Sequence, residues 1–193
     1  MTTFSLGAEP LSLGSWSQIA QGSVDLQIDP SALDAMQRSR AVVERAIESG
    51  QVVYGVNTGF GKLSNVQGGT DELAALQRNL LLSHATGVGE PLRDEVVRLA
   101  LALRANSLTQ GCSGVRLELV ESLLALFRHD LMPLVPSPGS VGASGDLAPL
   151  AHLALPLIGE GFVRKNGEVL PAAEALASVG IKPLQLEAKE GLA

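Results

Sequence analysis

Three consecutive residues in a glycine-rich segment have types that together allow unusual backbone chemistry. Ala143, Ser144 and Gly145 lie within residues 138–150, which read PGSVGASGDLAPL. In a tight bend the glycine nitrogen can attack the alanine carbonyl, because glycine has no side chain and reaches compressed backbone angles. Loss of water closes a five-membered ring, and the serine can lose its hydroxyl to leave an exocyclic methylidene group. The segment therefore contains the residues for an electrophile made from backbone.

The same segment has other interpretations. A Gly/Ser-rich stretch before a helix is commonly a flexible linker, with Asp146 as the N-cap of the helix. A serine-hydrolase elbow needs G-x-S-x-G, and around Ser144 the last glycine is misplaced. A phosphate-binding loop needs G-x-x-x-x-G-K-[ST], and no lysine follows. The residues alone leave the linker and the cyclised electrophile open.

Two further side chains are candidates for proton transfer or substrate contact. Tyr54 is the only tyrosine and precedes the glycine-rich stretch 55–61, GVNTGFG. A tyrosine base needs its pKa, near ~10 in a free side chain, brought closer to the working pH. His84 is expected at the C-terminal end of a helix, where the helix dipole favours a charged imidazole. A strand-end tyrosine and a helix-end histidine without catalytic roles are the alternative interpretations.

The remaining histidines and the cysteine give little indication of a site. His129 falls at an expected helix end, and His152 is expected to be partly buried on the helix after the Ala-Ser-Gly bend. No two histidines have metal-ligand spacing with a cysteine or carboxylate, so we expect no metal site. Cys112 stands in a turn-like sequence, QGCSG, and nothing in its surroundings indicates a nucleophile.

The composition indicates a folded, acidic chain. The 193 residues are 46% hydrophobic and 18% charged, with a formal net charge of −6. An acidic balance argues against nucleic-acid binding and against a basic membrane-surface helix. We recognise neither the ~18 consecutive apolar residues of a membrane span nor a signal peptide. The single cysteine excludes an internal disulfide and suits a reducing compartment, so we expect a cytoplasmic protein.

The hydrophobic pattern predicts a mainly α-helical fold. Helix starts are expected at Asp29-Pro30, at Thr70, at Pro91 and near Asp146. Another helix is expected to carry the apolar stripe 119–127.

Several details of this pattern can be compared with a structure. Residues 96–103 are apolar nearly all round, which predicts a helix buried on every side. Short strands are expected over 3–6 and 24–28, and the residues KNGE at 165–168 predict a hairpin turn. The last residues, 187–193, are typical of the opening of a helix, so we expect a truncated protein.

The order of these segments resembles one known family. Residues 139–151 resemble the signature of the aromatic amino acid lyases, whose electrophile, the methylidene-imidazolone (MIO) group, is built from Ala-Ser-Gly. Residues 54–61 resemble the catalytic tyrosine loop of that family, and residues 106–108 and 111–116 are also similar to it. The resemblance covers nearly the whole chain. It implies the N-terminal portion of a fumarase/aspartase-like helical MIO lyase fold with a short β-hairpin.

The resemblance also implies roles for the candidate residues. Ala143, Ser144 and Gly145 would form the MIO group autocatalytically, with no external cofactor, and this electrophile would bind the substrate amine. Tyr54, as a phenolate, would remove the β-proton, and His84 would contact the substrate ring. We expect the helix that starts at Asp146 to place the positive end of its dipole beside the electrophile.

One pair of residues indicates the substrate. Ser83-His84 is similar to the pair in the histidine ammonia-lyases of this family, which convert L-histidine to trans-urocanate and ammonia in histidine degradation. The alternatives are another MIO enzyme, such as a tyrosine or phenylalanine ammonia-lyase or an aminomutase, and a catalytically silent helical assembly module.

Members of the family are much longer than this chain. The resemblance implies that residues 1–193 form an N-terminal, MIO-bearing domain, without the C-terminal helical bundle that builds a homotetramer. Each active site of the family draws on three subunits and on later Asn, Tyr, Arg and Glu residues. We therefore expect little or no activity from this chain alone.

Overall fold

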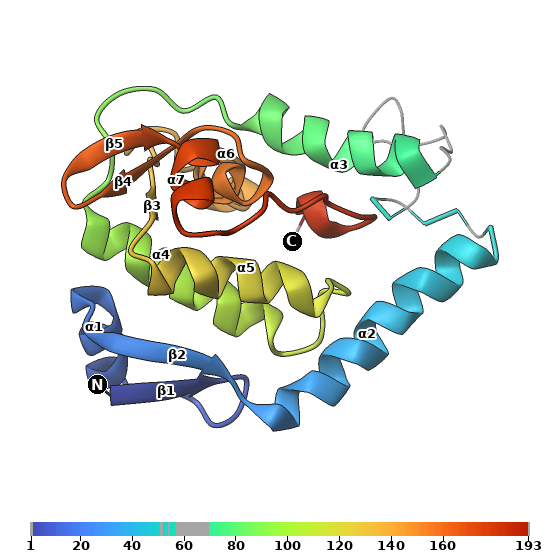
Figure 1. Cartoon of the computed structure of the whole chain (residues 1–193). Coiled ribbons are helices and arrows are strands. Elements are labelled where there is room, and N and C mark those ends of the chain that lie inside the picture. Colours follow the sequence, from blue (N-terminus) through green and yellow to red (C-terminus); the bar gives the residue numbers. More distant parts are fainter. Residues whose placement is uncertain (1, 51, 54, 57–69, 193) are drawn as a thin grey trace.

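The expected mainly helical fold with a short hairpin is confirmed by a computed structural model, which describes residues 2–50, 52–53, 55–56 and 70–192 (Figure 1). The helices are α1 (Leu13–Gln21), α2 (Pro30–Glu48), α3 (Thr70–His84), α4 (Asp94–Leu108), α5 (Leu117–Arg128), α6 (Leu147–Ala154) and α7 (Ala172–Ser178). The strands are β1 (Thr2–Leu6), β2 (Val24–Ile28), β3 (Met132–Pro133), β4 (Phe162–Lys165) and β5 (Glu168–Pro171). Short 3₁₀ turns span Gly142–Ser144, Leu155–Ile158 and Glu190–Leu192.

The N-terminal strands and the following helix start as the sequence predicts. Strands β1 and β2 pair in parallel, with Leu6 opposite Ile28, and α1 makes the crossover between them. Asp29 caps α2, because its carboxylate accepts a hydrogen bond of 2.9 Å from the backbone N–H of Ser31. Pro30 occupies the first turn, where its missing N–H costs no helical hydrogen bond.

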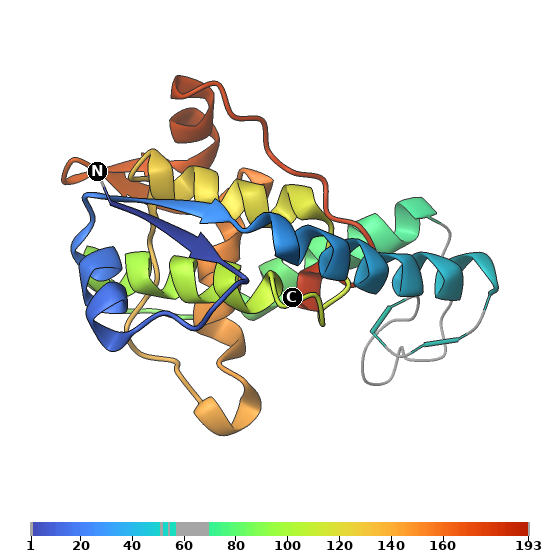
Figure 2. The ribbon, with the colours of Figure 1, turned by 90° about the horizontal axis from the view of Figure 1, so that it is seen from below.

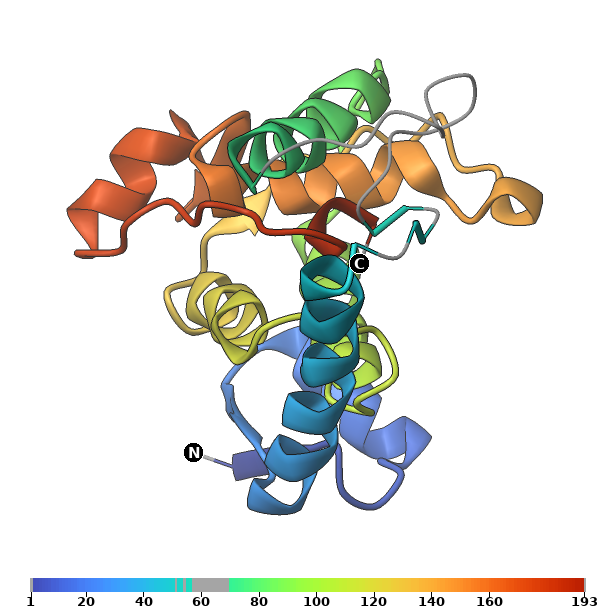
Figure 3. The ribbon, with the colours of Figure 1, turned by 90° about the vertical axis from the view of Figure 1, so that its right-hand side faces the viewer.

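Helices α4 and α5 form the middle layer of the molecule. They lie between the β1–β2 sheet and a layer that contains α3, α6 and α7, an arrangement that is visible in two directions (Figures 1 and 3). The predicted apolar stripe of α5 is buried as a block. Its buried side chains are those of Leu119, Val120, Leu123, Leu124, Leu126 and Phe127. This stripe makes α5 the centre of the hydrophobic core.

Two expectations for α4 are wrong. Pro91 does not open the helix, because it forms a β-bridge with Pro136 and α4 begins only at Asp94. The helix is also not buried on every side. Val97 is 1% exposed, whereas Val96 and Leu103 are 39% and 45% exposed, since the neighbouring elements among the described residues cover only part of α4.

The predicted hairpin is confirmed. Strands β4 and β5 pair antiparallel around the turn at Asn166-Gly167, and β3 adds a third strand. Helix α6 ends at Ala154, and a 3₁₀ turn carries Pro156 within its first residues. Proline lacks the N–H that a continuing α-helix would need at this point.

A buried ion pair fixes the last residues against the core. The Glu190 side chain is fully buried, and its two oxygens accept hydrogen bonds from three N–H groups of Arg116 and from the backbone N–H of Glu187. The N–H of the next residue, Gly191, donates to Oε1 of Gln77 on α3 at 2.8 Å. The expected helix opening over 187–193 is therefore a single 3₁₀ turn held between α3 and the start of α5.

The loop after α3 is tied to α6 by a histidine. The Gly87 N–H donates to Nε2 of His152 at 3.0 Å, and His152 is partly buried as the sequence predicts. Burial lowers the pKa of His152 below that of a free imidazole. The hydrogen bond also requires Nε2 to be unprotonated, so protonation of the ring breaks this tie.

We predict that Glu190→Gln lowers the free energy of unfolding by about 2–3 kcal/mol, because it leaves the Arg116 charge without a buried counter-ion. Urea unfolding followed by circular dichroism would measure the change. Glu160→Gln is the matched control, since its ion pair with Arg78 is exposed on both sides and its loss costs less than about 1 kcal/mol. Equal losses in the two variants would contradict the central role of Glu190.

We further predict that the tie between Gly87 and His152 makes stability depend on pH. The folded state binds a proton on His152 less readily than the unfolded state, so this contribution is full above about pH 6.5. It declines as the pH falls from there through the lowered pKa of the folded state. His152→Gln keeps an acceptor that does not titrate. Denaturation midpoints measured across this range should fall less steeply for the variant than for the wild type, and parallel slopes would contradict the assignment.

Candidate active site

The Ala-Ser-Gly segment forms a compact turn that extends away from the body of the molecule (Figure 2). The Ser144 N–H donates to the Val141 carbonyl at 2.8 Å, and the Gly145 N–H donates to the Gly142 carbonyl at 3.1 Å. Gly145 has φ 91° and ψ 22°, a left-handed conformation that glycine adopts without strain. A Cβ at Gly142 or Gly145 would meet no atom within 4 Å, so open space surrounds the turn.

This turn fits the residues that ring closure requires. Ala143 and Ser144 lie within one 3₁₀ turn, and Gly145 follows at once. The Ser144 hydroxyl is exposed and donates to the Val141 carbonyl at 2.8 Å, so no buried contact holds it in place. The three residues are thus small, bent and sterically free.

Asp146 does not act as the expected side-chain cap of α6. It occupies the N-cap position in a left-handed conformation (φ 54°, ψ 40°), and its side chain makes no capping hydrogen bond. Its carboxylate instead accepts a hydrogen bond of 2.6 Å from the Ser140 hydroxyl, because the left-handed backbone turns the side chain towards the preceding loop. Asp146 therefore closes the loop 140–146, and α6 begins directly behind the turn.

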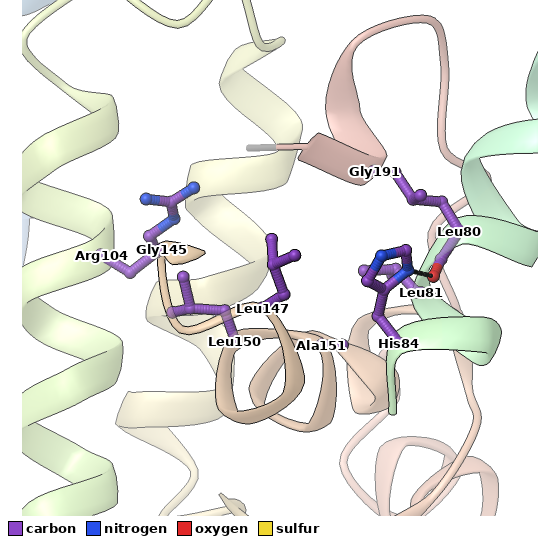
Figure 4. Close-up of a pocket in the computed structure, with 9 residues that line it drawn as sticks. All are labelled: Leu80, Leu81, His84, Arg104, Gly145, Leu147, Leu150, Ala151 and Gly191. Carbon is purple, nitrogen blue, oxygen red and sulfur yellow. Dashed lines mark hydrogen bonds between the residues drawn. The ribbon is translucent and has the colours of Figure 1, made fainter. Parts of the chain in front are cut away.

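A pocket of about 250 Å³ brings His84 and Gly145 together (Figure 4). His84 comes from the end of α3, and Gly145 precedes α6, so two elements far apart in sequence share this pocket. Its other walls include Leu80, Leu147 and Leu150. An apolar cavity with a few polar groups is typical of a small-molecule site.

The tautomer of His84 follows from its hydrogen bond. Its Nδ1 lies 2.8 Å from the Leu80 carbonyl, which can only accept, so Nδ1 carries the proton. In the neutral ring, Nε2 is then an acceptor. The imidazole can therefore receive a hydrogen bond from an N–H group of a ligand.

The other residues that the sequence singled out lie apart from this pocket or outside the described residues. Tyr54 is outside them, so its role as a base stays a prediction. His129 ends α5 at the surface, and Cys112 is an exposed free thiol. Across residues 2–50, 52–53, 55–56 and 70–192, no cluster of three or more His, Cys, Asp or Glu residues has the arrangement of a metal site.

Sequence reasoning missed one charged residue of the pocket. Arg104, on α4, lines the same pocket as His84 and Gly145. Burial lowers the pKa of its guanidinium, and within the described parts of the chain it has no hydrogen-bond or ion-pair partner. The sequence signal for Arg104 is its isolation, because it is the one charged residue in the otherwise uncharged stretch 99–108 of this helix.

Within the described residues, none of the helices is both long enough and apolar enough to cross a lipid bilayer.

The chain is similar to known proteins over nearly its whole length. Residues 11–193 match the family model of the aromatic amino acid lyases. Histidine ammonia-lyase of Deinococcus radiodurans is 54% identical over 183 residues, covering 95% of this chain and 35% of the relative. That of Salmonella choleraesuis is 50% identical, covering 100% of this chain and 38% of the relative. The chain thus spans little more than a third of the length of these relatives.

Solved structures give the same result for the fold. The crystal structure of histidine ammonia-lyase from Trypanosoma cruzi superposes with a TM-score of 0.91 at 37% identity, covering 100% of this chain and 37% of the other. Ergothionase from Treponema denticola superposes with a TM-score of 0.93 at 33% identity, covering 98% of this chain and 38% of the other. With the family model matching residues 11–193, this chain belongs to the aromatic amino acid lyase family.

Proposed function

We propose that residues 1–193 are the N-terminal, electrophile-bearing domain of an enzyme that eliminates ammonia from L-histidine to give trans-urocanate. The observation that carries the proposal is the common pocket of His84 and Gly145. It brings a ring-recognising imidazole to the segment that can become an electrophile. The relatives named histidine ammonia-lyase, at about half identity, support the same activity.

The electrophile would be the MIO group, formed from Ala143, Ser144 and Gly145. Once formed, this group supplies an acceptor for the substrate amine and makes the amine a good leaving group. The chain's own contribution is the compact turn, in which Ala143 is small, Gly145 is free of side-chain obstruction and Ser144 has an unburied hydroxyl. Helix α6 begins directly after the turn, so its N–H dipoles favour negative charge there.

His84 would select the substrate. Its Nε2 acceptor can bind the N–H of a substrate imidazole, and a phenyl ring would leave that acceptor unpaired. Tyr54, as a phenolate, would remove the β-proton. This division of roles favours histidine over phenylalanine, whereas the fold alone is shared with aminomutases and other lyases.

Assembly would complete the site. We propose a cytoplasmic homotetramer, in which later parts of the protein and neighbouring subunits supply the remaining groups around the substrate. The pocket is open, and its described lining residues include no group to hold the substrate amine apart from the turn itself. The chain alone should therefore be inactive.

The first test is the intact mass of the purified chain. A protein lighter by two water molecules has cyclised Ala143-Ser144-Gly145, and Ser144→Ala should abolish this loss. The same measurement on a completed protein, in which this chain is followed by the remaining part of the Deinococcus radiodurans relative, tests whether ring closure needs the rest of the fold. A completed protein that keeps its full mass and forms no urocanate would refute the proposed function.

A second test concerns His84. In the completed protein, His84→Leu should lower kcat/KM for histidine by about 100-fold and raise activity with phenylalanine relative to histidine, because the polar contact is lost. Urocanate and cinnamate formation are followed by absorbance. His129→Leu is the matched control and should behave as the wild type. Cinnamate or coumarate as the main product of the unaltered protein would favour a phenylalanine or tyrosine enzyme.

A further inference from the structure

Arg104 lies at the boundary between the candidate active site and the hydrophobic core. It lines the pocket that holds His84 and Gly145, and it also lines a small adjoining cavity with Leu108 and Leu119. Figure 4 shows its side chain on the same side of the pocket as Gly145, with His84 on the other. A charged group is unusual in such apolar surroundings.

The charge of Arg104 is not neutralised within the described residues. Its guanidinium has no hydrogen-bond or ion-pair partner there. Glu190 lines the adjoining cavity too, but both of its oxygens are engaged by Arg116 and by the N–H of Glu187. Burial lowers the pKa of Arg104, yet a guanidinium stays protonated near neutral pH.

An unpaired cation beside an apolar pocket has a clear electrostatic effect. Its partial desolvation costs free energy, and no counter-ion among the described residues offsets this cost. The partly buried position of Arg104 strengthens its attraction for negative charge that develops beside Gly145, which lines the same pocket. Apart from Arg104 and His84, the side chains that line the pocket are apolar.

This inference rests on the proposed function. We propose that the positive charge of Arg104 assists the cyclisation of Ala143-Ser144-Gly145. Its guanidinium stabilises the negative charge that forms on the Ala143 carbonyl oxygen during ring closure. Among the described residues, the hydrogen bonds of the turn stay within residues 140–146, and a Cβ at Gly145 would meet no atom within 4 Å. A fixed charge on α4 therefore adds a constraint from outside this local network.

The reaction that Arg104 assists balances without any co-reactant. The Gly145 nitrogen forms a bond to the Ala143 carbonyl carbon, and the carbonyl π electrons move to the oxygen. The Gly145 amide proton is transferred to that oxygen to give a hydroxyl group. The C–O bond then breaks as the Ser144 nitrogen gives up its proton and forms a double bond to the former Ala143 carbonyl carbon, which releases the first water. Ser144 then loses its α-hydrogen and its hydroxyl as the second water. Negative charge is greatest on the oxygen at the first step, where a nearby cation acts most strongly.

The experiment compares Arg104→Gln, Arg104→Lys and the control Arg93→Gln. Arg93 is an exposed arginine at the N-cap of the same helix. Each variant is made in the chain and in the completed protein, and intact mass is followed with time after cell-free synthesis. We expect Arg104→Gln to lose the two waters at least about tenfold more slowly, Arg104→Lys to be intermediate, and Arg93→Gln to match the wild type.

Further measurements distinguish this role of Arg104 from a purely structural role and from substrate binding. Circular dichroism and thermal unfolding report whether Arg104→Gln folds. Where it does not, Arg104→Met replaces it, because methionine keeps much of the apolar stem without the charge, and wild-type cyclisation in a folded Arg104→Met variant would overturn the proposal. Cyclisation of Arg104→Gln at the wild-type rate also overturns it. If KM for histidine then rises at unchanged ring content, Arg104 binds substrate instead. A wild-type completed protein that cyclises and eliminates ammonia while Arg104→Gln matches it refutes only this inference, whereas no cyclisation in either refutes the proposed function as well.

Discussion

The buried pair of Arg116 and Glu190 is the interaction on which the pocket wall depends. Arg116 stands at the start of α5, at the edge of the core, and Glu190 belongs to the last turn of the chain. Glu190 is fully buried, so its charge persists only because Arg116 and a backbone N–H satisfy its oxygens. The pair fixes Gly191 beside Gln77, and Gly191 lines the pocket together with His84. A long-range ion pair thus positions one wall of the site.

The walls and the reactive turn differ in how they are held. Gly191 approaches α3 so closely that a Cβ there would lie 2.8 Å from the Gln77 carbonyl oxygen, which leaves room only for glycine. On the other side, the tie between Gly87 and His152 joins the loop after α3 to α6. Within the part of the chain that the structure describes, the hydrogen bonds of the turn 142–145 are to its own sequence neighbours. Walls tied by long-range contacts and a turn with local hydrogen bonds suit a segment that must change its covalent structure.

Local chemistry explains which features could be predicted from the sequence. Asp29-Pro30 specifies a helix start by capping and by a fixed φ, and the stripe of α5 specifies a buried face, so both are confirmed. Pro91 satisfies the same local rule for a helix start but forms a bridge to Pro136, a residue 45 positions away that no local rule includes. Asp146 is similar, since its backbone conformation and its Ser140 contact override its capping preference.

The features of the candidate site also divide into those that local sequence specifies and those that depend on long-range packing. The Ala-Ser-Gly segment is recognisable because its chemistry is contiguous, and His84 because it follows a helix pattern. That His84, Gly145 and Arg104 share one pocket depends on the packing of α3, α4 and α6, which periodicity does not specify. From the sequence alone, Arg104 is one polar position in an apolar stretch of helix. The proposed role of Arg104 rests on its place in the pocket beside Gly145 and on its having no partner among the described residues.

Water exclusion gives a physical reason why this pocket would need further protein around it. Val141 and Leu147, on either side of the reactive turn, are 56% and 46% exposed. A ring closure that is assisted by a fixed cation, as proposed for Arg104, is favoured by a dry site, because water weakens the electrostatic interaction. Exposed apolar side chains beside the turn are what a domain would present if more protein closed over it. They therefore support the proposal that the site is completed by protein beyond this domain.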